Sequence, residues 1–430
     1  MTTRLSTADA DFEARFSAFL ATKRESSREV GDIVSEIIAR VRAQGDAAVA
    51  EYTSRFDGFA VEKIGMRVTR AEIEAAYDNT DEKTLEALRT AHQRIEMHHR
   101  RQVPKDERYT DALGVELGWR WTPLSAVGLY VPGGTASYPS SVLMNAVPAR
   151  VAGVERIAMT VPAPEGKLNP LVLVAADMAG VGEIFRIGGA QAIAALAYGT
   201  ETIAQVDKIV GPGNAYVAAA KRQVFGQVGN DMLAGPSEVL VVADGDNDPD
   251  WIEADLLAQA EHDTAAQSIL MTDDARLAEA VSEAVARQIK GLSRGKIAGA
   301  SWHDFGAIIL LGSLDEAPAL IDRIAPEHLE LATDRAEDLL ARVQNAGAVF
   351  MGRHTPEVIG DYVGGSNHVL PTARSARFSS GLSVLDFVKR MSVLRLGAEQ
   401  LRALGPAAIA LAEAEGLDAH GRSVAIRLNL

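Results

Sequence analysis

Four of the nine histidines follow a carboxylate or carboxamide residue with which they could form a metal site. They are His262 after Gln259, His328 after Glu327, His368 after Asp361, and His420 after Glu415. If residues 255–264 form a helix, the three-residue spacing puts the first pair on one face. Imidazole nitrogens and carboxylate oxygens bind zinc and related metals, but none of these pairs has the spacing of a known metal-binding motif. A joint metal site and ordinary buried or surface histidines both remain open on spacing alone.

The adjacent Glu327 and His328 could both accept protons in a reaction. Pro326 is suited to the first position of a helix, which would place the two side chains in its first turn. There the positive end of the helix dipole would keep the glutamate ionised and the histidine neutral. Both would then be ready to act as general bases. A helix that starts near Asp418 would likewise hold His420 in its first turn, and a neutral imidazole is the form that a metal requires.

Three glycine-containing segments follow expected strands and lead into alanine-rich helical segments. They are residues 130–141, 186–199 and 209–221. In an open α/β sheet such junctions bind ligands, because the backbone N–H groups at a helix start face outward there. None of the three has the spaced glycines of the common dinucleotide fingerprint. Spacing alone therefore leaves a phosphate-bearing cofactor and ordinary tight turns equally open.

Short apolar, β-branched runs alternate with helical segments over most of the chain, which is typical of parallel sheets. The first such array covers about residues 126–236, and a second has strands near 238–244, 268–272, 306–312 and 347–352. Residues 1–105 and the last 50 are expected to be mostly helical, because apolar side chains recur there at spacings of three and four.

These arrays predict a discontinuous larger α/β domain and a smaller second one. The expected divisions are an N-terminal helical extension at 1–25, the larger domain at 26–125 plus 237–381, the second domain at 126–236, and a C-terminal tail at 382–430. Such a tail can dock on its own chain or on a partner chain.

Composition excludes several classes of function. Lys and Arg total 43 against 58 Asp and Glu, a net charge of -15, which opposes binding to nucleic acid or to an anionic membrane. No apolar run approaches the ~18 residues that span a bilayer, and no secretory signal is recognisable. The chain has no cysteine, which excludes disulfides, thiolate metal ligands and a cysteine nucleophile. We expect a cytoplasmic protein with neither a nucleic-acid nor a membrane partner.

Eight segments together carry a resemblance to a known family. In chain order they are GLYVPGGTASYPSSVLMNAVPA, GGAQAIAALAYGT, KIVGPGNAYVAAAK, AGPSEVL, LLAQAEHD, PEHLEL, GDYVGGSNHVLPT and EGLDAH. From about residue 20 to its end, the sequence resembles the L-histidinol dehydrogenases. The resemblance implies two unequal Rossmann-like α/β domains with small helical N- and C-terminal extensions, in an intertwined homodimer.

The resemblance also implies a reaction and a set of site residues. The reaction is the zinc-dependent oxidation of L-histidinol to L-histidine through the aldehyde, by two successive hydride transfers to two NAD, at the end of histidine biosynthesis. The NAD contacts would be Tyr130, Gln191 and Asn214. The ligands of one zinc ion per subunit would be Gln259, His262, Asp361 and His420, the last contributed by the partner chain. The substrate would contact these four ligands together with Ser237, His328, His368 and Glu415. The proton acceptors would be Glu327 and His328.

The lack of cysteine shapes the expected mechanism. An aldehyde can lose hydride only after a tetrahedral adduct has formed, and many dehydrogenases form that adduct with a thiolate. Here water must add instead, and Glu327 is the natural base to activate it. His328 would accept the alcohol proton in the first step. The role expected of zinc is to orient the substrate.

Three other functions fit parts of the same sequence. A sister enzyme of the same fold could oxidise another small alcohol, such as a sulfonated diol, but it would not need the full imidazole-binding shell. A zinc hydrolase would leave Tyr130, Gln191 and Asn214 without a task. A non-catalytic binding protein of two α/β lobes would not need the bases Glu327 and His328. Manganese or cobalt could also occupy a nitrogen and oxygen site of this kind.

Overall fold

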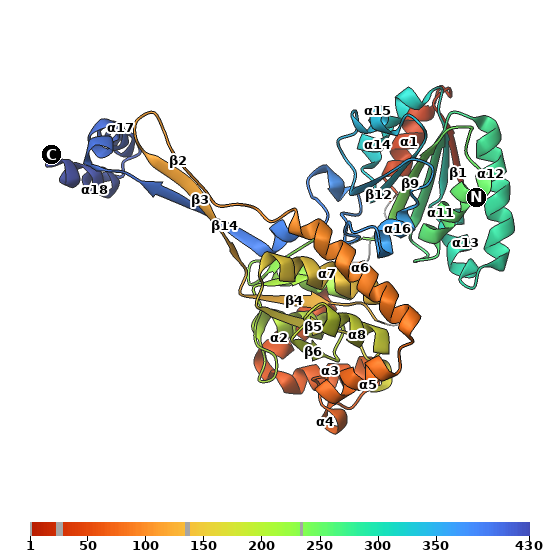
Figure 1. The fold of residues 1–430 in the computed structure, drawn as a ribbon, viewed down its shortest axis with the longest axis horizontal. Coiled ribbons are helices and arrows are strands. Elements are labelled where there is room, and N and C mark those ends of the chain that lie inside the picture. Colours follow the sequence, from red (N-terminus) through yellow and green to blue (C-terminus); the bar gives the residue numbers. More distant parts are fainter. Residues whose placement is uncertain (1, 23–28, 134–137, 233–234) are drawn as a thin grey trace. The chain divides into compact units, whose positions relative to one another are not determined.

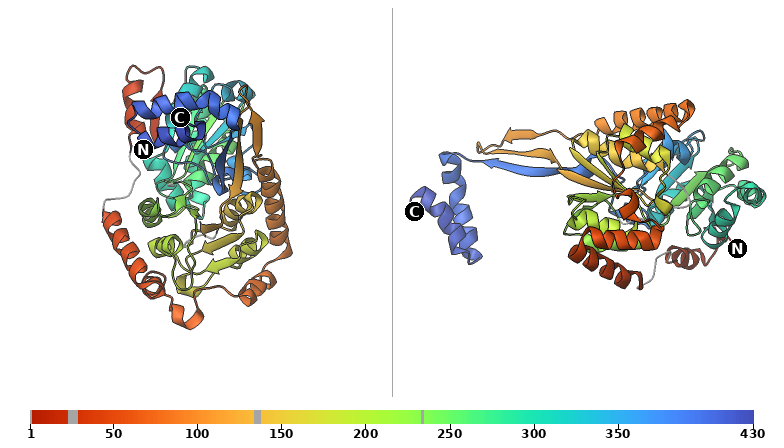
Figure 2. Two further views of the ribbon diagram at one scale, coloured as in Figure 1. Left: turned by 90° about the vertical axis from the view of Figure 1, so that its left-hand side faces the viewer. Right: turned by 90° about the horizontal axis from the view of Figure 1, so that it is seen from below.

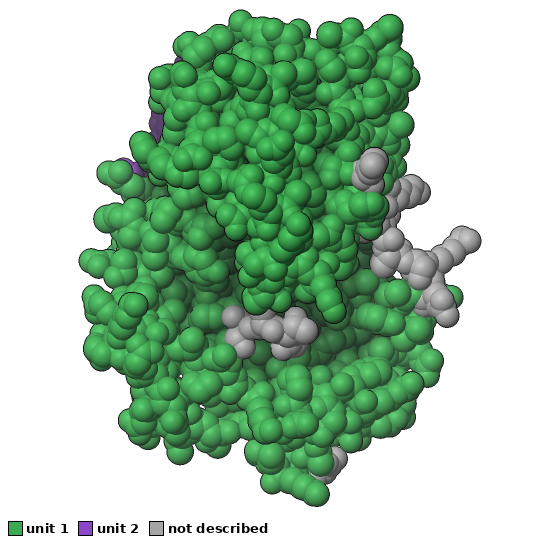
Figure 3. All heavy atoms as spheres, turned by 90° about the vertical axis from the view of Figure 1, so that its right-hand side faces the viewer, with its two compact units in different colours: residues 1–102, 125–387 green, residues 103–124, 388–430 purple. Residues whose placement is uncertain are grey.

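The computed structural model describes residues 2–22, 29–133, 138–232 and 235–430. The chain divides into two compact units, coloured separately in Figure 3. Unit 1 comprises residues 1–102 and 125–387, and unit 2 comprises residues 103–124 and 388–430. Within the described ranges, no helix is both long and apolar enough to cross a membrane.

Unit 1 contains a six-stranded sheet in which every neighbouring pair is parallel, in the order β1-β11-β10-β9-β12-β13. Its strands are β1 (Thr3–Ser6), β9 (Glu238–Ala243), β10 (Gln267–Thr272), β11 (Ala307–Leu310), β12 (His328–Ala332) and β13 (Ala348–Met351). The four strands expected in the second array are present. Strand β12 was not expected, and β1 joins the sheet although residues 1–25 were assigned to a helical extension.

Helices cover both faces of this sheet, as Figure 1 shows. The helices α1 (Phe12–Leu20), α14 (Ala317–Ile324) and α15 (Ala336–Leu340) share a core with Leu240 and Val242 of β9. The helices α11 (Pro249–Ala260), α12 (Ala275–Gln288) and α13 (Gly295–Asp304) share another with Val239 and Val241. Side chains on a strand alternate between its faces, so a strand that is covered on both sides reads as one continuous apolar run.

A five-stranded parallel sheet forms the rest of the frame of unit 1, in the order β6-β5-β4-β7-β8. Its strands are β4 (Ala126–Tyr130), β5 (Arg156–Thr160), β6 (Glu183–Phe185), β7 (Lys208–Val210) and β8 (Gly229–Asn230). Between them run α7 (Pro139–Ala152), α8 (Pro170–Met178), α9 (Gly189–Tyr198) and α10 (Ala215–Val224). The strand-and-helix array expected from residue 126 onward is therefore confirmed.

The amino-terminal helices pack with the five-stranded sheet. They are α2 (Glu29–Gln44), α3 (Asp46–Asp57), α4 (Val61–Ile64), α5 (Arg70–Asp78) and α6 (Glu82–Arg100). Val34, Ile37 and Val41 of α2 share a core with Ile193 and Leu196 of α9. The sequence interpretation grouped residues 26–125 with the six-stranded sheet instead. An apolar stripe predicts that a helix is buried, but it does not say against which sheet.

Unit 2 combines two segments that lie far apart in the sequence. Strands β2 (Glu107–Thr110), β3 (Glu116–Pro123) and β14 (Val388–Arg395) form an antiparallel sheet in the order β14-β3-β2. Helices α17 (Ala398–Ala414) and α18 (Asp418–Leu428) pack against each other, as Figure 2 shows. The helix predicted near Asp418 is confirmed, whereas β14 was not expected in a mostly helical tail. Its residues are largely exposed, so the strand lacked the apolar run that reveals a buried one.

Candidate active site

Glu327 and His328 lie at the amino-terminal edge of the six-stranded sheet. The Oε2 atom of Glu327 accepts a hydrogen bond from the backbone N–H of Glu238, at 2.9 Å. The Nδ1 atom of His328 lies 2.9 Å from the carbonyl oxygen of Glu238. Because a carbonyl can only accept, Nδ1 must carry a proton and donate it. In the neutral ring this leaves Nε2 as the proton-accepting atom, and Nε2 is buried without a hydrogen-bond partner among the described residues.

The helix expected to begin at Pro326 is absent, and this prediction was wrong. Helix α14 ends at Ile324, Ala325 adopts a left-handed conformation with φ +49°, and β12 begins at His328. Proline is common one or two residues beyond a helix end, because it cannot continue the helix. Pro326 therefore follows a helix that has just ended. The pair Glu327 and His328 gains nothing from a helix dipole.

Three carboxylates surround the imidazole of His328. Glu327 Oε2 and Glu357 Oε2 each lie 3.7 Å from Nδ1, and Asp361 Oδ1 lies 3.7 Å from Nε2. Glu357 and Asp361 belong to helix α16 (Glu357–Tyr362). The side chains of His328, Glu327 and Glu357 are only 5%, 7% and 1% exposed. Charges in so dry a cluster interact strongly.

This crowding shifts the protonation of every member of the cluster. Burial raises the pKa of Glu327 to about 8 and that of Glu357 to about 8. Burial opposes the charged form of His328, but the Glu357 and Glu327 carboxylates outweigh it and hold the pKa of His328 well above its usual value. The sequence interpretation expected an ionised glutamate beside a neutral histidine. The structure instead gives groups that share protons near neutral pH.

A further layer of acids supports the cluster from within the sheet. The Oε1 atom of Glu330 on β12 accepts the backbone N–H of Glu357 at 2.7 Å, which fixes the start of α16. Glu330 also shares a hydrogen bond with Asp255, and burial raises the pKa of Glu330 well above its usual value. Neither Glu330 nor Glu357 was among the predicted site residues. The signal that could have found Glu330 is a charged residue at a fully covered strand position in HLELA.

Asp361 and His368 are joined through one hydrogen bond. The Nδ1 atom of His368 donates to the carbonyl oxygen of Asp361 at 3.0 Å, so its Nε2 atom accepts from the Ser141 hydroxyl at 3.4 Å. Burial opposes ionisation of Asp361, but His328, His368 and His262 outweigh it and lower the pKa of Asp361. Ser141 belongs to α7, which follows the carboxyl end of β4. This contact therefore links the edges of the two parallel sheets.

Gln259 and His262 lie at the end of α11. The helix stops at Ala260, short of the expected 264, and the backbone N–H of His262 donates to the carbonyl of Gln259 at 3.2 Å in the turn that follows. Gln259 is 1% exposed, and its Nε2 atom is buried without a partner in the described ranges. A fully buried amide that lacks a partner indicates a position built for another group.

Ser237 stands at the same amino-terminal edge. It directly precedes β9, and its carbonyl accepts the backbone N–H of Gln267 at 2.9 Å. Its side chain is half-buried. Ser237 therefore follows the same pattern as Glu327, since both stand immediately before a strand of the six-stranded sheet.

The predicted metal ligands are divided between the two units. Gln259, His262 and Asp361 belong to unit 1, whereas His420 belongs to unit 2, where it lies in the first turn of α18. Glu415, a predicted substrate contact, also belongs to unit 2. Among the described residues, no three His, Asp or Glu side chains form a group that could hold a metal ion. Only two of the predicted ligands in unit 1 are of those types, since Gln259 is an amide. Unit 1 by itself thus supplies an incomplete set.

The predicted cofactor contacts lie at the carboxyl edge of the five-stranded sheet. Tyr130 ends β4, and its hydroxyl accepts the backbone N–H of Gly189 at 3.2 Å. Burial raises the pKa of Tyr130 to about 12. Gln191 is 1% exposed, and its Oε1 atom is buried without a partner in the described part of the chain. Asn214 caps α10 by accepting the N–H groups of Tyr216 and Val217, both at 3.1 Å.

A buried ion pair fixes the loop that carries Asn214. Lys221 and Asp231 pair with side chains 3% and 1% exposed. Lys221 Nζ also donates to the carbonyl of Gly211 at 3.0 Å, and Asp231 accepts the N–H of Gly211 at 2.7 Å. Gly211 has φ +108°, and a Cβ there would lie 2.1 Å from the carbonyl oxygen of Tyr130. Only glycine fits this approach. Residues 134–137, in the first of the three predicted junctions, lie outside the described ranges.

Comparison with known proteins agrees with this arrangement. The family model described as histidinol dehydrogenase matches residues 20–428. The histidinol dehydrogenases of Mesorhizobium japonicum and Brucella suis biovar 1 are 71% and 69% identical over the full length of both chains. This chain belongs to the histidinol dehydrogenase family. The crystal structure of histidinol dehydrogenase from Elizabethkingia anophelis superposes with a TM-score of 0.95 at 34% identity, covering 100% of this chain and 98% of that one.

Membership of the histidinol dehydrogenase family confirms the recognised resemblance and the α/β fold, and it makes the chain a dehydrogenase. The structure brings Glu327, His328, Asp361 and His368 together through the contacts given above. Sequence reasoning missed Glu238, Glu330 and Glu357. Glu238 reaches the cluster because β9 pairs with β12, and Glu330 and Glu357 meet where α16 begins. A local sequence motif cannot predict either contact.

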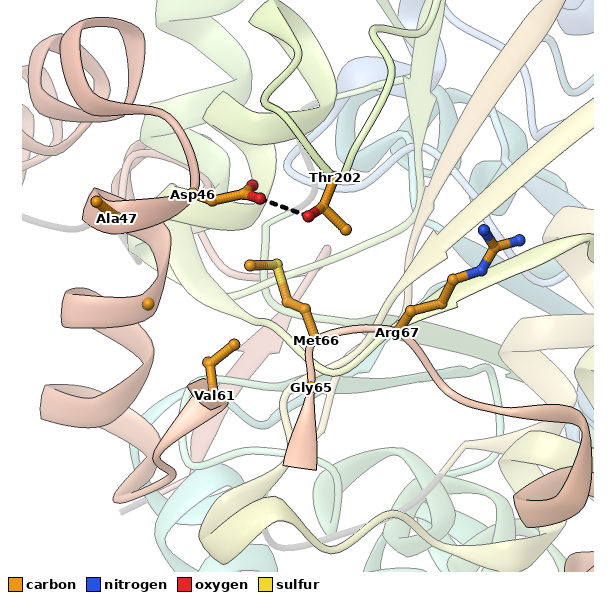
Figure 4. A pocket seen from close by; sticks show the side chains of 8 residues that line it. Asp46, Ala47, Val61, Gly65, Met66, Arg67 and Thr202 are labelled. Carbon is orange, nitrogen blue, oxygen red and sulfur yellow. Dashed lines mark hydrogen bonds between the residues drawn. The ribbon is translucent and has the colours of Figure 1, made fainter. Parts of the chain in front are cut away.

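A surface pocket lies away from the predicted site residues. It has a volume of about 440 Å³ and is lined by Asp46, Ala47, Ala50, Val61, Gly65, Met66, Arg67 and Thr202. Figure 4 shows Asp46 hydrogen-bonded to Thr202 across it. None of the predicted site residues lines this pocket. It borders the first turns of α3, whereas the cofactor candidates stand at the strand ends.

Proposed function

We propose that this chain oxidises L-histidinol to L-histidine through the aldehyde, using two NAD, in the last steps of histidine biosynthesis. The observation that carries the proposal is the buried pair of Glu327 and His328. The backbone N–H and carbonyl of Glu238 bind the two side chains, and Asp361 lies beside His328. A dehydrogenase that oxidises twice needs a proton acceptor for the alcohol and a base for water. This pair supplies both within one cluster.

A zinc ion would be held by Gln259, His262, Asp361 and, from a second copy of the chain, His420. The burial of the Gln259 carboxamide, whose oxygen can bind a cation, and the nitrogen and oxygen character of the set support this assignment. Bound zinc would serve as a template that orients the substrate. The division of the ligands between two units supports a homodimer in which α18 of one chain completes the site of the other.

NAD would bind at the carboxyl edge of the five-stranded sheet, and its chemistry is to accept hydride from the substrate carbon. Tyr130, Gln191 and Asn214 are the residues proposed to contact it. The hydrogen bond between Ser141 and His368 supports this location, because it joins the proposed cofactor edge to the proposed catalytic edge.

In the first oxidation, the neutral form of His328, present because the buried cluster shares protons, takes the hydroxyl proton as hydride leaves the carbinol carbon. The carbonyl of Glu238 holds Nδ1–H, so the accepting lone pair of the neutral ring is on Nε2, the side on which Asp361 lies. Ser237, His368 and Glu415 complete the proposed substrate contacts. The product of this step is the aldehyde.

In the second oxidation, a water oxygen adds to the aldehyde carbon while Glu327 takes its proton. The resulting gem-diolate loses a second hydride and becomes the acid, which then ionises to the carboxylate of histidine. A base with a pKa of about 8 suits this task, because it is both available and strong enough near neutral pH. The sum consumes one water and releases two hydrides and three protons for each histidine formed.

The direct test incubates the purified protein with L-histidinol, NAD and zinc and follows NADH absorbance together with histidine. Two NADH per histidine, abolished by a chelator and restored by zinc, is the expected result. NADH from a different small alcohol, but none from histidinol, would move the chain to a sister activity. No NADH from any alcohol would overturn the proposal.

The shared site has a separate test in mixed dimers. A His420→Asn chain and a Glu327→Gln chain are each expected to form homodimers that make little or no histidine, so histidine formation is the activity that this test follows. Their heterodimer contains one site with both residues intact, so partial activity should return. No activity in verified heterodimers would mean that each site is built within one chain. The proposal further places the enzyme in the cytoplasm, where a chain without cysteine has no need of oxidising conditions.

A further inference from the structure

Asp57 occupies an unfavourable place for a carboxylate. It is the last residue of α3, where the negative end of the helix dipole repels an anion. The residue is half-buried, and burial raises the pKa of its carboxyl group. Its Oδ2 atom is buried and has no hydrogen-bond partner in the described ranges. The helix end, the burial and the unpartnered oxygen each destabilise the folded protein. A side chain that carries all three costs indicates a role other than stability.

The surroundings of Asp57 belong to the carboxyl edge of the five-stranded sheet. The charge of Asp57 raises the pKa of Tyr130, the residue that ends β4. Helix α3 packs against α9, which begins at Gly189 just beyond β6. Phe59, two residues after Asp57, packs at Gly166, in the segment that follows β5. Asp57 therefore stands beside the ends of β4, β5 and β6.

A second unpartnered polar side chain lies at the same edge. Gln191 is 99% buried, and its Oε1 atom has no partner among the described residues. Gly189 has φ +65°, and a Cβ there would lie 2.8 Å from that oxygen. Oε1 of Gln191 and Oδ2 of Asp57 both accept hydrogen bonds, so the group that satisfies them must present donors.

A ribose diol offers such donors, whereas a phosphate does not. The two hydroxyls of the diol can both donate to one carboxylate. A 2′-phosphate carries negative charge and only acceptors at neutral pH, so the same carboxylate would repel it. The difference between NAD and NADP is this one group.

We propose that Asp57 accepts hydrogen bonds from a ribose diol of NAD and thereby selects NAD over NADP. This inference rests on the NAD site proposed above and adds to it a specificity-determining residue. Asp57 is outside the three glycine-containing junctions, and it reaches the site from the end of an amino-terminal helix.

The test compares Asp57→Asn with the wild type in the zinc-loaded dimer. Steady-state kinetics with NAD and NADP, and fluorescence titration with NADH and NADPH, give the preference in two independent ways. The ratio of kcat/KM for NAD to that for NADP is expected to fall roughly 10- to 100-fold, because a charged hydrogen-bond acceptor is lost and a repulsion is removed. The loss should fall mainly on KM for NAD.

Asp78→Asn is the matched control. Asp78 is also the last residue of a helix, α5, but it is exposed. The same change in charge and shape at that position should leave the cofactor ratio unchanged. A similar fall in both variants would assign the effect to overall charge and overturn the proposal.

Thermal unfolding separates a binding role from a structural one. If Asp57 serves binding and not stability, Asp57→Asn removes a partly buried negative charge from the carboxyl end of α3, where the helix dipole disfavours it. The Tm should then stay the same or rise. A lower Tm with an unchanged cofactor ratio would overturn the proposal. Gln191→Ala and Asn214→Ala distinguish failure of the inference from failure of the site. If they weaken NADH binding while Asp57→Asn does not, only the inference fails; if none of the three weakens it, the NAD site itself is wrong.

Discussion

The two parallel sheets of unit 1 carry their candidate functional residues at opposite ends of their strands. In the five-stranded sheet, Tyr130 and the segments with Gln191 and Asn214 follow the carboxyl ends. In the six-stranded sheet, Ser237 and Glu327 precede strands, and His328 begins one. The first arrangement is the common one for open α/β sheets, where helix N-termini face the ligand. The second is the reverse.

The difference teaches which groups each edge uses. At the five-stranded sheet, Gly211 allows a close approach to the backbone of Tyr130, and the backbone N–H of Gly189 donates to the Tyr130 hydroxyl, beside the proposed NAD site. At the six-stranded sheet, titratable side chains are buried where the strands begin, and the backbone N–H of Glu238 donates a hydrogen bond to Glu327. The first edge offers shape and backbone groups to the proposed cofactor, whereas the second brings several titratable side chains together, at a cost in stability.

The largest effect is expected from Glu327→Gln. Without the carboxylate, water cannot be activated, so aldehyde oxidation should slow roughly 10²- to 10⁴-fold, while alcohol oxidation persists. The measurement is NADH and histidine formation from L-histidinol, with the aldehyde trapped and quantified. The variant should yield NADH and aldehyde but little histidine.

Glu253→Gln serves as the control, since Glu253 is buried in α11 and the charges that act on it are Asp250, Arg287 and Asp255. It should leave both oxidations unchanged. Equal slowing of both steps in Glu327→Gln would reject the division of roles between Glu327 and His328. It would also weaken the contrast between the two edges.

Much of this contrast could be predicted from the sequence for the five-stranded sheet and little for the other. Strands such as β4 and β5 are continuous apolar runs that end in glycine or proline, so local patterns locate both the strand and its functional end. Strand β12 begins with a histidine and contains Glu330, and it follows Pro326. Local rules therefore interpreted it as the start of a helix.

The remaining errors come from contacts that span long sequence distances. Pairing of β1 with β11 joins residue 3 to residue 307, and pairing of β14 with β3 joins residue 388 to residue 123. No local pattern encodes these partners. The helices from residue 29 onward were predicted as helices, but their packing partner was not. The resemblance supplied the predicted site residues, and the structure shows that Glu330 and Glu357 lie behind Glu327 and His328.

A smaller effect, on stability, is expected at the cofactor edge from Lys221→Met. This change leaves Asp231 charged and buried, so the free energy of unfolding should fall by about 3–5 kcal/mol. Affinity for NADH should also weaken, because Gly211 loses one of the groups that hold its loop. Urea unfolding and fluorescence titration check the two effects.

Two further variants sharpen the result. Lys221→Met combined with Asp231→Asn removes both charges and should recover most of the lost stability. Arg287→Met breaks the exposed pair with Asp250, whose side chains are 59% and 60% exposed, and should cost under about 1 kcal/mol. If Lys221→Met costs no more than Arg287→Met, the loop does not depend on the buried pair.

The smallest effect is expected from Glu253→Gln on stability, and it depends on pH. Burial raises the pKa of Glu253 from 4.5 to about 7, so folding favours its protonated form. The wild type therefore loses stability as pH rises from about 4.5 through 7, and the glutamine variant avoids this loss. At pH 8 the variant should be more stable by about 1–3 kcal/mol, and at pH 4.5 the two should converge. Thermal unfolding at both pH values measures this. A constant difference across the range would mean that Glu253 is ionised in the native state. In that case, burial at the six-stranded sheet would not by itself keep a carboxyl group protonated, and the raised pKa of Glu327 would have to come from its charged neighbours at the catalytic edge.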